Sequence, residues 1–167
     1  TIGDGAFQST QLQSITIPAS VTSIRNYAFN NCQKLSSINY ADNCRLTSLG
    51  ESAFNGCPIS TFKIPKNLIY MGYQDFSDSL KQIVVEEGNK FFESIDGMLC
   101  SKSDNSLVYV PKNKTSVYLP NYVTAIKNGV LRYHQNLQTL VLTAIISDLG
   151  ESPFCENYNL TEIYCMN

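Results

Sequence analysis

Few residues of this sequence could do chemistry: one histidine, six cysteines, and short serine and carboxylate motifs. Ser52 and Ser152 follow Gly-Glu in Gly50–Phe54 and Gly150–Phe154, which share the start of the G-x-S-x-G nucleophile elbow of hydrolases. A working elbow also needs a strand-to-helix turn and a histidine partner. Both segments end in Phe and fall where a turn is expected. We therefore interpret them as turns and rank hydrolysis last among the possible functions.

The single histidine, His134, is the only candidate for an imidazole base. It lies in Leu131–Gln135, a segment that we expect to form a turn, so we predict a surface or capping role. A zinc site would need scattered thiolates, because there is one histidine and no CxxC pair. We expect a protein that is not an enzyme and has no metal and no cofactor.

The six cysteines fall into two groups. Cys32 and Cys57 each lie three residues after a Phe, and Cys165 occupies an expected inward position of a strand. We expect these three to be reduced, buried thiols that act as small apolar side chains. The others lie outside that pattern and are the candidates for a disulfide or an exposed thiol: Cys44, Cys100 and Cys155.

Two further kinds of motif could bind a metal ion or carry a glycan. Glu86 and Glu87 follow a predicted strand close to Asn89, an arrangement that could form a weak calcium site, although a solvated loop is the favoured interpretation. N-glycosylation sequons begin at Asn113 and Asn159, and they hint at a secretory route.

Composition excludes several classes of protein. The net charge is −2 and charged residues make up 16%, so no basic surface for nucleic acid is expected. No apolar run is long enough for a membrane span, so we expect no membrane insertion. The length of 167 residues suits one domain, residues 1–167. The chain begins without Met, inside a repeat, so we expect a fragment that stacks on neighbouring repeats of a parent chain.

The elements that must position these residues come from an internal repeat, L-x-x-I-x-I. Its last apolar positions are 17, 40, 64, 85, 119, 142 and 165, with steps of 23, 24, 21, 34, 23 and 23 residues. The alternation in I-x-I predicts a short strand with two side chains inward and one outward. Seven such strands cannot bury their apolar residues singly, but stacked coils can.

A second block recurs out of phase with the first. It comprises a short extended piece, such as Val21–Ile24, and then an Ala-Phe pair, such as Ala28-Phe29 and Ala53-Phe54. We expect the Ala-Phe pair to form a helical turn that places a large ring in the core. Between Val85 and Leu119 this block is missing. Asp96-Gly97 is instead a good two-residue hairpin turn, so a β-hairpin or three-strand meander is predicted at about residues 89–111.

These blocks resemble the BspA-like leucine-rich-repeat family, also called the type 5 or Treponema pallidum class. The segment Ile15–Leu35 carries its Ile-Pro, Val-Thr, Ala-Phe, Cys and Leu positions, and Leu49–Cys57 repeats part of it. The segment 89–120 is similar to the family's hairpin module. Asp75, Val130 and Pro153 depart from the usual Ala.

The resemblance implies a right-handed leucine-rich-repeat solenoid of about seven rungs, mainly β with short helical turns and with one convex turn replaced by a β-hairpin. It also implies cell-surface or secreted proteins that adhere to host matrix and cell-surface proteins. The family has no catalytic residues to transfer to this chain.

A solenoid presents its outward strand side chains as one face. The middle residue of each I-x-I forms a row that is polar first and apolar or aromatic later: Thr16, Asn39, Lys63, Val84, Tyr118, Val141 and Tyr164. We hypothesise that a protein partner is bound around Val84, Tyr118, Val141 and Tyr164, with Lys63 and Asn39 as further contacts. Cross-strand packing without a partner is the other explanation of this row.

Two other functions stay open at this point. The chain could be a structural spacer within a longer solenoid. It could also bind glycans, given its hydroxyl-rich rows and ten tyrosines, although only Tyr118 and Tyr164 are placed for stacking on a sugar.

Overall fold

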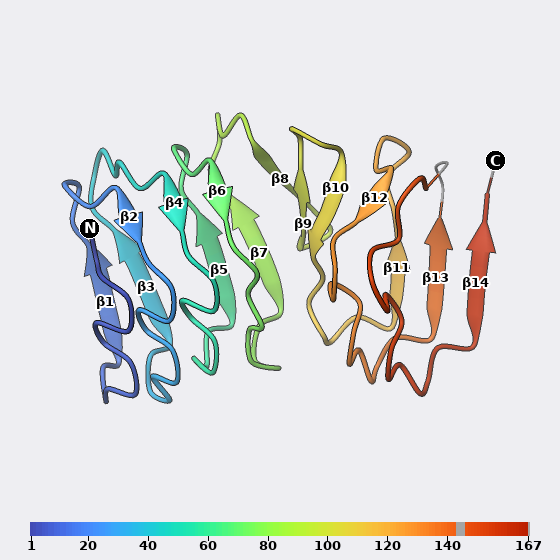
Figure 1. Ribbon diagram of the computed structural model, residues 1–167, viewed down its shortest axis with the longest axis horizontal. Coiled ribbons are helices and arrows are strands. Elements are labelled where there is room, and N and C mark those ends of the chain that lie inside the picture. The colour runs from blue at the N-terminus through green and yellow to red at the C-terminus, as the bar shows by residue number, and fades with distance from the viewer. Residues whose placement is uncertain (143–145, 167) are drawn as a thin grey trace. The chain divides into compact units, whose positions relative to one another are not determined.

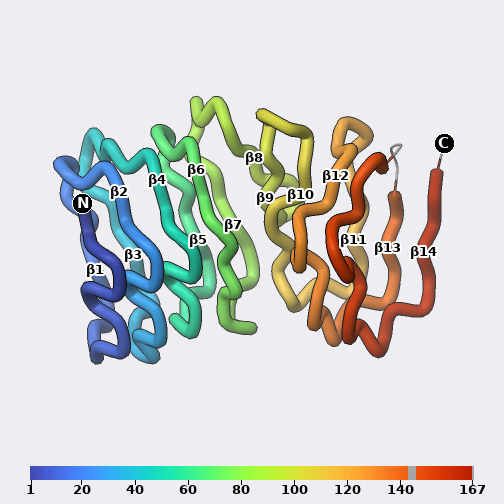
Figure 2. Tube along the Cα trace, in the orientation of Figure 1, coloured from blue at the N-terminus to red at the C-terminus, as the bar shows by residue number. Residues whose placement is uncertain are grey.

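The computed structural model describes residues 1–142 and 146–166 and contains no helix among them. It divides into two compact units, Thr1–Phe91 (unit 1) and Phe92–Asn167 (unit 2), and each is described by itself. Within each unit the chain runs in stacked coils (Figures 1 and 2). The predicted fold class, a leucine-rich-repeat solenoid built of strands, is confirmed, and the prediction of a single domain stays a prediction.

All seven strands predicted from L-x-x-I-x-I are present, and we call them the first row. In unit 1 they are β1 (Ser14–Ile17), β3 (Ser37–Tyr40), β5 (Thr61–Ile64) and β7 (Gln82–Val85); in unit 2 they are β11 (Ser116–Tyr118), β13 (Thr139–Leu142) and β14 (Glu162–Cys165). The pairs β1–β3, β5–β7, β11–β13 and β13–β14 are parallel, and equivalent repeat positions face each other. A hydrogen bond of 3.0 Å from the Tyr40 hydroxyl to the Lys63 carbonyl links β3 to β5.

A second row of two-residue strands closes each coil. In unit 1 it consists of β2 (Ser23–Ile24), β4 (Ser48–Leu49) and β6 (Tyr70–Met71), paired in parallel. In unit 2 it contains β12 (Ala125–Ile126). In each two-residue strand one side chain points inward, as Ile24 does in β2 and Leu49 in β4. These two side chains are buried, like the inward residues of the first row. The core of each unit therefore lies between its two rows.

The Ala-Phe blocks are successive turns, where short helical turns were expected. Tyr27 and Asn31 have positive φ (57° and 58°), which interrupts helical geometry. Their N–H groups, and that of Phe29, donate to carbonyls of the following coil, at Glu51, Asn55 and Ala53. The intervening N–H groups donate to carbonyls three residues earlier in their own coil. Backbone bonding between coils thus replaces the bonds that would make a helix.

The phenylalanines of these blocks form a stack through unit 1. The rings of Phe7, Phe29 and Phe54 are nearly parallel, with centroids 5.1 Å apart at each step. That spacing is close to the separation of paired strands, so one ring per coil keeps contact with the next. Phe62, which belongs to β5, then links Phe54 to Phe76 at tilted angles, with centroids 5.4 and 4.9 Å apart.

Unit 2 begins with the predicted meander. Its strands β8 (Phe92–Ile95), β9 (Met98–Ser101) and β10 (Ser106–Tyr109) are antiparallel neighbours. The turn residues Asp96 and Gly97 both have positive φ (51° and 76°), as the two-residue hairpin turn requires. Strand β10 pairs in parallel with β12 (Figure 1), so the meander ends by supplying a second-row strand. Its residues Met98, Cys100 and Leu107 belong to the core of the unit.

Candidate functional site

The outward side of the first row in unit 2 presents two tyrosines on either side of a valine. Tyr118 on β11 faces Val141 on β13, and Val141 faces Tyr164 on β14. Tyr118 is 61% exposed and Tyr164 is 50% exposed. The parallel register places the three side chains in one line across the sheet, as the repeat predicted.

Val141 itself is not an exposed contact, which corrects the prediction for this residue. It is only 5% exposed although it points to the same side of the sheet as the tyrosines. Alternation along a strand fixes the side to which a residue points but not what its neighbours cover. Here a small side chain lies in register between two large ones.

A polar row runs beside the aromatic one. Ser116, Thr139 and Glu162 face one another across the same three strands. The Thr139 hydroxyl donates to a Glu162 carboxylate oxygen at 3.4 Å. The negative charge of Glu162, and a hydrogen bond from the phenol to it, raise the pKa of Tyr164. Tyr164 therefore remains a neutral hydrogen-bond donor and acceptor at physiological pH.

The first row of unit 1 presents a more polar face. Thr16 faces Asn39, and Lys63 faces Val84, which is 41% exposed. Lys63 Nζ lies 3.4 Å from a Glu86 carboxylate oxygen, an exposed ion pair. The residues of the predicted binding patch are thus divided between the two units. Asn39, Lys63 and Val84 belong to unit 1, whereas Tyr118, Val141 and Tyr164 belong to unit 2.

Comparison with known proteins shows to which family the chain belongs. The model of the BspA type Leucine rich repeat region matches in six copies, over residues 1–118 and 105–167. The chain belongs to the BspA-type leucine-rich-repeat family. A search of curated proteins gave no match.

Solved structures of bacterial proteins share this fold. The pneumococcal vaccine antigen PcpA superposes with a TM-score of 0.86 at 30% identity, over 96% of this chain and 41% of that one. A leucine-rich cell surface protein of Faecalibacterium prausnitzii gives 0.80 at 25% identity, over 96% and 43%. A leucine-rich-repeat protein of Eubacterium ventriosum, 16% identical with a TM-score of 0.73 over 98% and 57%, shares the fold. The chain spans about two fifths of the first two structures.

The Cys position of the BspA-type repeat has a defined structural role. The thiol of Cys32 donates to the carbonyl of Phe7 at 3.0 Å, and that of Cys57 donates to the carbonyl of Phe29 at 3.2 Å. Each thiol therefore bonds to the carbonyl of the aromatic residue one coil earlier. This confirms that both cysteines are buried and reduced, with a hydrogen bond added to their packing.

His134 and Asn157 occupy the same position in unit 2, and the sequence interpretation missed this. Each lies three residues after the large apolar residue of its turn, as Cys32 does after Phe29. Asn157 Nδ2 donates to the Leu131 carbonyl at 2.6 Å, and Asn157 Oδ1 accepts from the His134 backbone N–H at 2.7 Å. The shared offset from Leu131 and Phe154 was the signal that could have found them.

His134 is buried and only 2% exposed, so the surface alternative of the predicted surface or capping role is wrong. Its ring nitrogens lie 2.9 Å from the Val110 carbonyl and 3.0 Å from the Arg132 carbonyl. Burial lowers the pKa of the imidazole, outweighing the carbonyl hydrogen bonds that raise it. The ring therefore joins two coils and is enclosed by protein.

The remaining cysteines differ from the predictions. All six are free thiols. Cys44 and Cys100, the candidates for a disulfide or an exposed thiol, are buried, and Cys155 is half-buried. Cys165, expected inside, is exposed. Its strand β14 is exposed along its whole length, because the described residues place no further coil against it.

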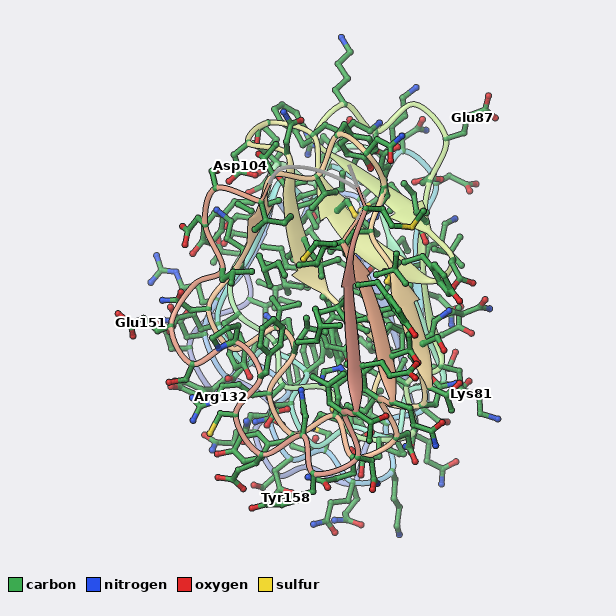
Figure 3. The ribbon with its side chains drawn as sticks, turned by 90° about the vertical axis from the view of Figure 1, so that its right-hand side faces the viewer. Lys81, Glu87, Asp104, Arg132, Glu151 and Tyr158 are labelled. Atoms are coloured by element: carbon green, nitrogen blue, oxygen red, sulfur yellow. The ribbon has the colours of Figure 1, made fainter. Side chains whose placement is uncertain are left out.

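The other chemical motifs are structural. Ser52 and Ser152 lie in turns and have positive φ (49° and 46°), as interpreted. Glu86 accepts hydrogen bonds from Lys63 Nζ and from the Lys66 backbone N–H, and Glu87 projects into solvent (Figure 3). Asn89 is buried, and its side-chain amide donates to the Pro65 and Leu68 carbonyls. Over residues 1–142 and 146–166 there is no group of three or more His, Cys, Asp or Glu placed to hold a metal.

Both sequon asparagines are exposed and lie in turns. Asn113 is on the turn between the meander and β11. Asn159 donates through Nδ2 to the Gln135 carbonyl at 2.6 Å. In the described residues, no helix is long and apolar enough to cross a membrane.

Proposed function

We propose that the chain is a non-catalytic binding module that recognises a partner protein through the strand face of unit 2. The observation that carries the proposal is the exposure of Tyr118 and Tyr164 on either side of the covered Val141. Tyrosine is enriched among the residues that dominate protein interfaces, because it buries much area at little cost in conformational entropy.

The surroundings of the two rings favour recognition over simple cross-strand packing. At least half of each ring is exposed, so its apolar surface is available to a partner. The adjacent row of Ser116, Thr139 and Glu162 offers hydroxyl and carboxylate groups as a polar rim.

We further propose that the protein acts at the cell surface or after secretion, as an adhesion module for host matrix or cell-surface proteins. The similar structures support this: one is a vaccine antigen of pneumococcus, and another is described as a cell surface protein. The two exposed sequon asparagines, Asn113 and Asn159, would be available for glycosylation if the chain follows a eukaryotic secretory route.

A binding assay separates this proposal from the spacer and glycan alternatives. The chain, immobilised on beads, is exposed to fibronectin, to intact epithelial cells and to the same cells stripped of glycans by glycosidases. An unrelated leucine-rich-repeat solenoid serves as control. The proposal expects capture above the control that survives deglycosylation. Capture equal to the control would support a spacer, and capture lost on deglycosylation would support glycan binding; either would contradict the proposal.

A further inference from the structure

Unit 1 contains a groove, away from the first-row face, that no part of the proposed function uses. It has a volume of about 480 Å³ and is lined by residues of the loops that follow β3, β5 and β7. These strands all run in the same direction (Figure 1), so the loops after them meet at one edge of the unit. The size is in the range of pockets that bind ligands.

The groove combines positive charge with apolar walls. Arg45, Lys66 and Lys90 line it, together with Ile69 and Phe91. Ile69 is 50% exposed, which is high for a large aliphatic side chain. Within residues 1–91, all of which the structure describes, no Asp or Glu lines the groove. In a chain of net charge −2, three cations around one hollow are a local excess of positive charge.

The three charged groups are free to meet a ligand. The Glu86 carboxylate, on the same loop as Lys90, accepts hydrogen bonds from Lys63 Nζ and from the backbone N–H of Lys66. Among the described residues, no carboxylate is paired with the side chain of Arg45, Lys66 or Lys90. Arg45 Nε donates to the Ala19 carbonyl at 3.1 Å, which leaves the terminal nitrogens of the guanidinium available to a ligand.

Two features show that the groove is built into the fold. Gly88 has a positive φ of 83°, and a Cβ at this position would lie 2.9 Å from Cε of Lys66. The glycine thus makes room for the lysine stem. The buried Asn89 donates through Nδ2 to the Pro65 and Leu68 carbonyls at 3.0 and 3.1 Å and accepts from the Phe91 N–H at 2.8 Å. It therefore fixes two of the lining loops to each other.

We propose that this groove binds an acidic peptide segment of a partner protein, in which carboxylates alternate with apolar side chains. The cations would pair with the carboxylates, and the Arg45 guanidinium can bind one of them in a bidentate manner. Ile69 and Phe91 would cover the apolar side chains. An aliphatic wall favours a peptide over an anionic sugar, whose ring offers little apolar surface to Ile69. The proposal concerns unit 1 and does not depend on the tyrosine face of unit 2.

The test uses fluorescence polarisation of a labelled peptide in which Glu alternates with Leu, titrated with the full chain. A peptide with Gln in place of Glu, and a labelled heparin fragment, are the comparison ligands. We expect the Glu peptide to bind, with an affinity that falls as salt is raised, and to bind at least about tenfold more tightly than the Gln peptide. Equal binding of the two peptides, or binding of heparin alone, would overturn the proposal.

Charge-matched variants locate the site. Lys66→Gln with Lys90→Gln should weaken binding of the Glu peptide by roughly tenfold or more. The control, Lys34→Gln with Lys81→Gln, removes the same charge from exposed positions outside the groove (Lys81 in Figure 3) and should change affinity less than about twofold. Equal losses in both variants would contradict the assignment. The variant Tyr118→Ala with Tyr164→Ala should keep full peptide binding, which separates this proposal from the proposed function.

Discussion

The side-chain amide of Asn157 donates a hydrogen bond of 2.6 Å to the carbonyl oxygen of Leu131 in the preceding coil. It is the counterpart of the bond from the Cys57 thiol to the Phe29 carbonyl. At this repeat position Cys32, Cys57, His134 and Asn157 each join their coil to a carbonyl of the preceding one. Cys, His and Asn differ in chemistry, but all three can reach a carbonyl at the distance between coils.

Replacement of Asn157 should destabilise the protein. Asn157→Leu leaves the Leu131 carbonyl without its donor and the buried His134 N–H without its acceptor. We expect the free energy of unfolding to fall by about 2 kcal/mol or more, as measured by urea denaturation. Asn159→Ala is the control, because Asn159 makes a similar bond to the Gln135 carbonyl at an exposed position. Equal losses for the two variants would contradict a structural role specific to the buried bond.

Gly50 should not tolerate a side chain. A Cβ at Gly50 would lie 2.5 Å from the backbone nitrogen of Asn26, whereas a Cβ at Gly3 would have no neighbour within 4 Å. Gly50→Ala must push two coils apart, so we expect a loss of about 1–3 kcal/mol in the free energy of unfolding. Gly3→Ala should be nearly neutral in the same denaturation experiment. A stable Gly50→Ala variant would show that the coils are less closely spaced than described.

Stability should fall as the pH drops through the pKa that histidine has in the unfolded chain. Burial lowers the pKa of His134 in the folded protein from its ordinary 6.5. Below about pH 6.5 the unfolded chain therefore takes up a proton that the folded protein does not, which favours unfolding. Between about pH 7.5 and pH 5 the wild type should lose more stability than the His134→Asn variant, because asparagine does not titrate. Identical pH profiles would refute this account of the ring.

The thiols should react with a maleimide or disulfide reagent in the order of their exposure. Cys165 is exposed, Cys155 is half-buried and the other four are buried. Burial also raises the pKa of Cys57 to about 12 and that of Cys100 to about 11. At about pH 8 these two hold almost no reactive thiolate. Mass spectrometry of the native protein should find Cys165 modified first, and rapid modification of Cys57 would be inconsistent with the structure.

The repeat predicted the fold well because one period constrains every coil in the same way. The seven L-x-x-I-x-I copies became the seven first-row strands, and Asp96-Gly97 became the expected hairpin turn. The conformation of the turns around Phe29 was harder to predict, because it is determined by hydrogen bonds to the next coil, at Ala53 and Glu51. Local sequence alone favours a helical turn there.

The candidate site was predicted only in part, for physical reasons that differ by residue. Alternation placed Tyr118 and Tyr164 on the outward side, where they are exposed. The same rule could not reveal that Val141, which points to the same side, is buried. His134 was misplaced because a single polar residue in a turn suggests the surface. Its burial depends on acceptors 24 and 2 residues away, at Val110 and Arg132.

An affinity measurement on one double variant tests whether the tyrosines of unit 2 form the binding surface. Tyr118→Ala with Tyr164→Ala is compared with Tyr70→Ala with Tyr158→Ala, which removes two tyrosines that are 55% and 77% exposed elsewhere. Binding to the captured partner is followed by biolayer interferometry. The first variant should bind at least about 30-fold more weakly and the second about as well as wild type. Unchanged affinity of the first variant, with its fold intact by circular dichroism, would contradict the claim.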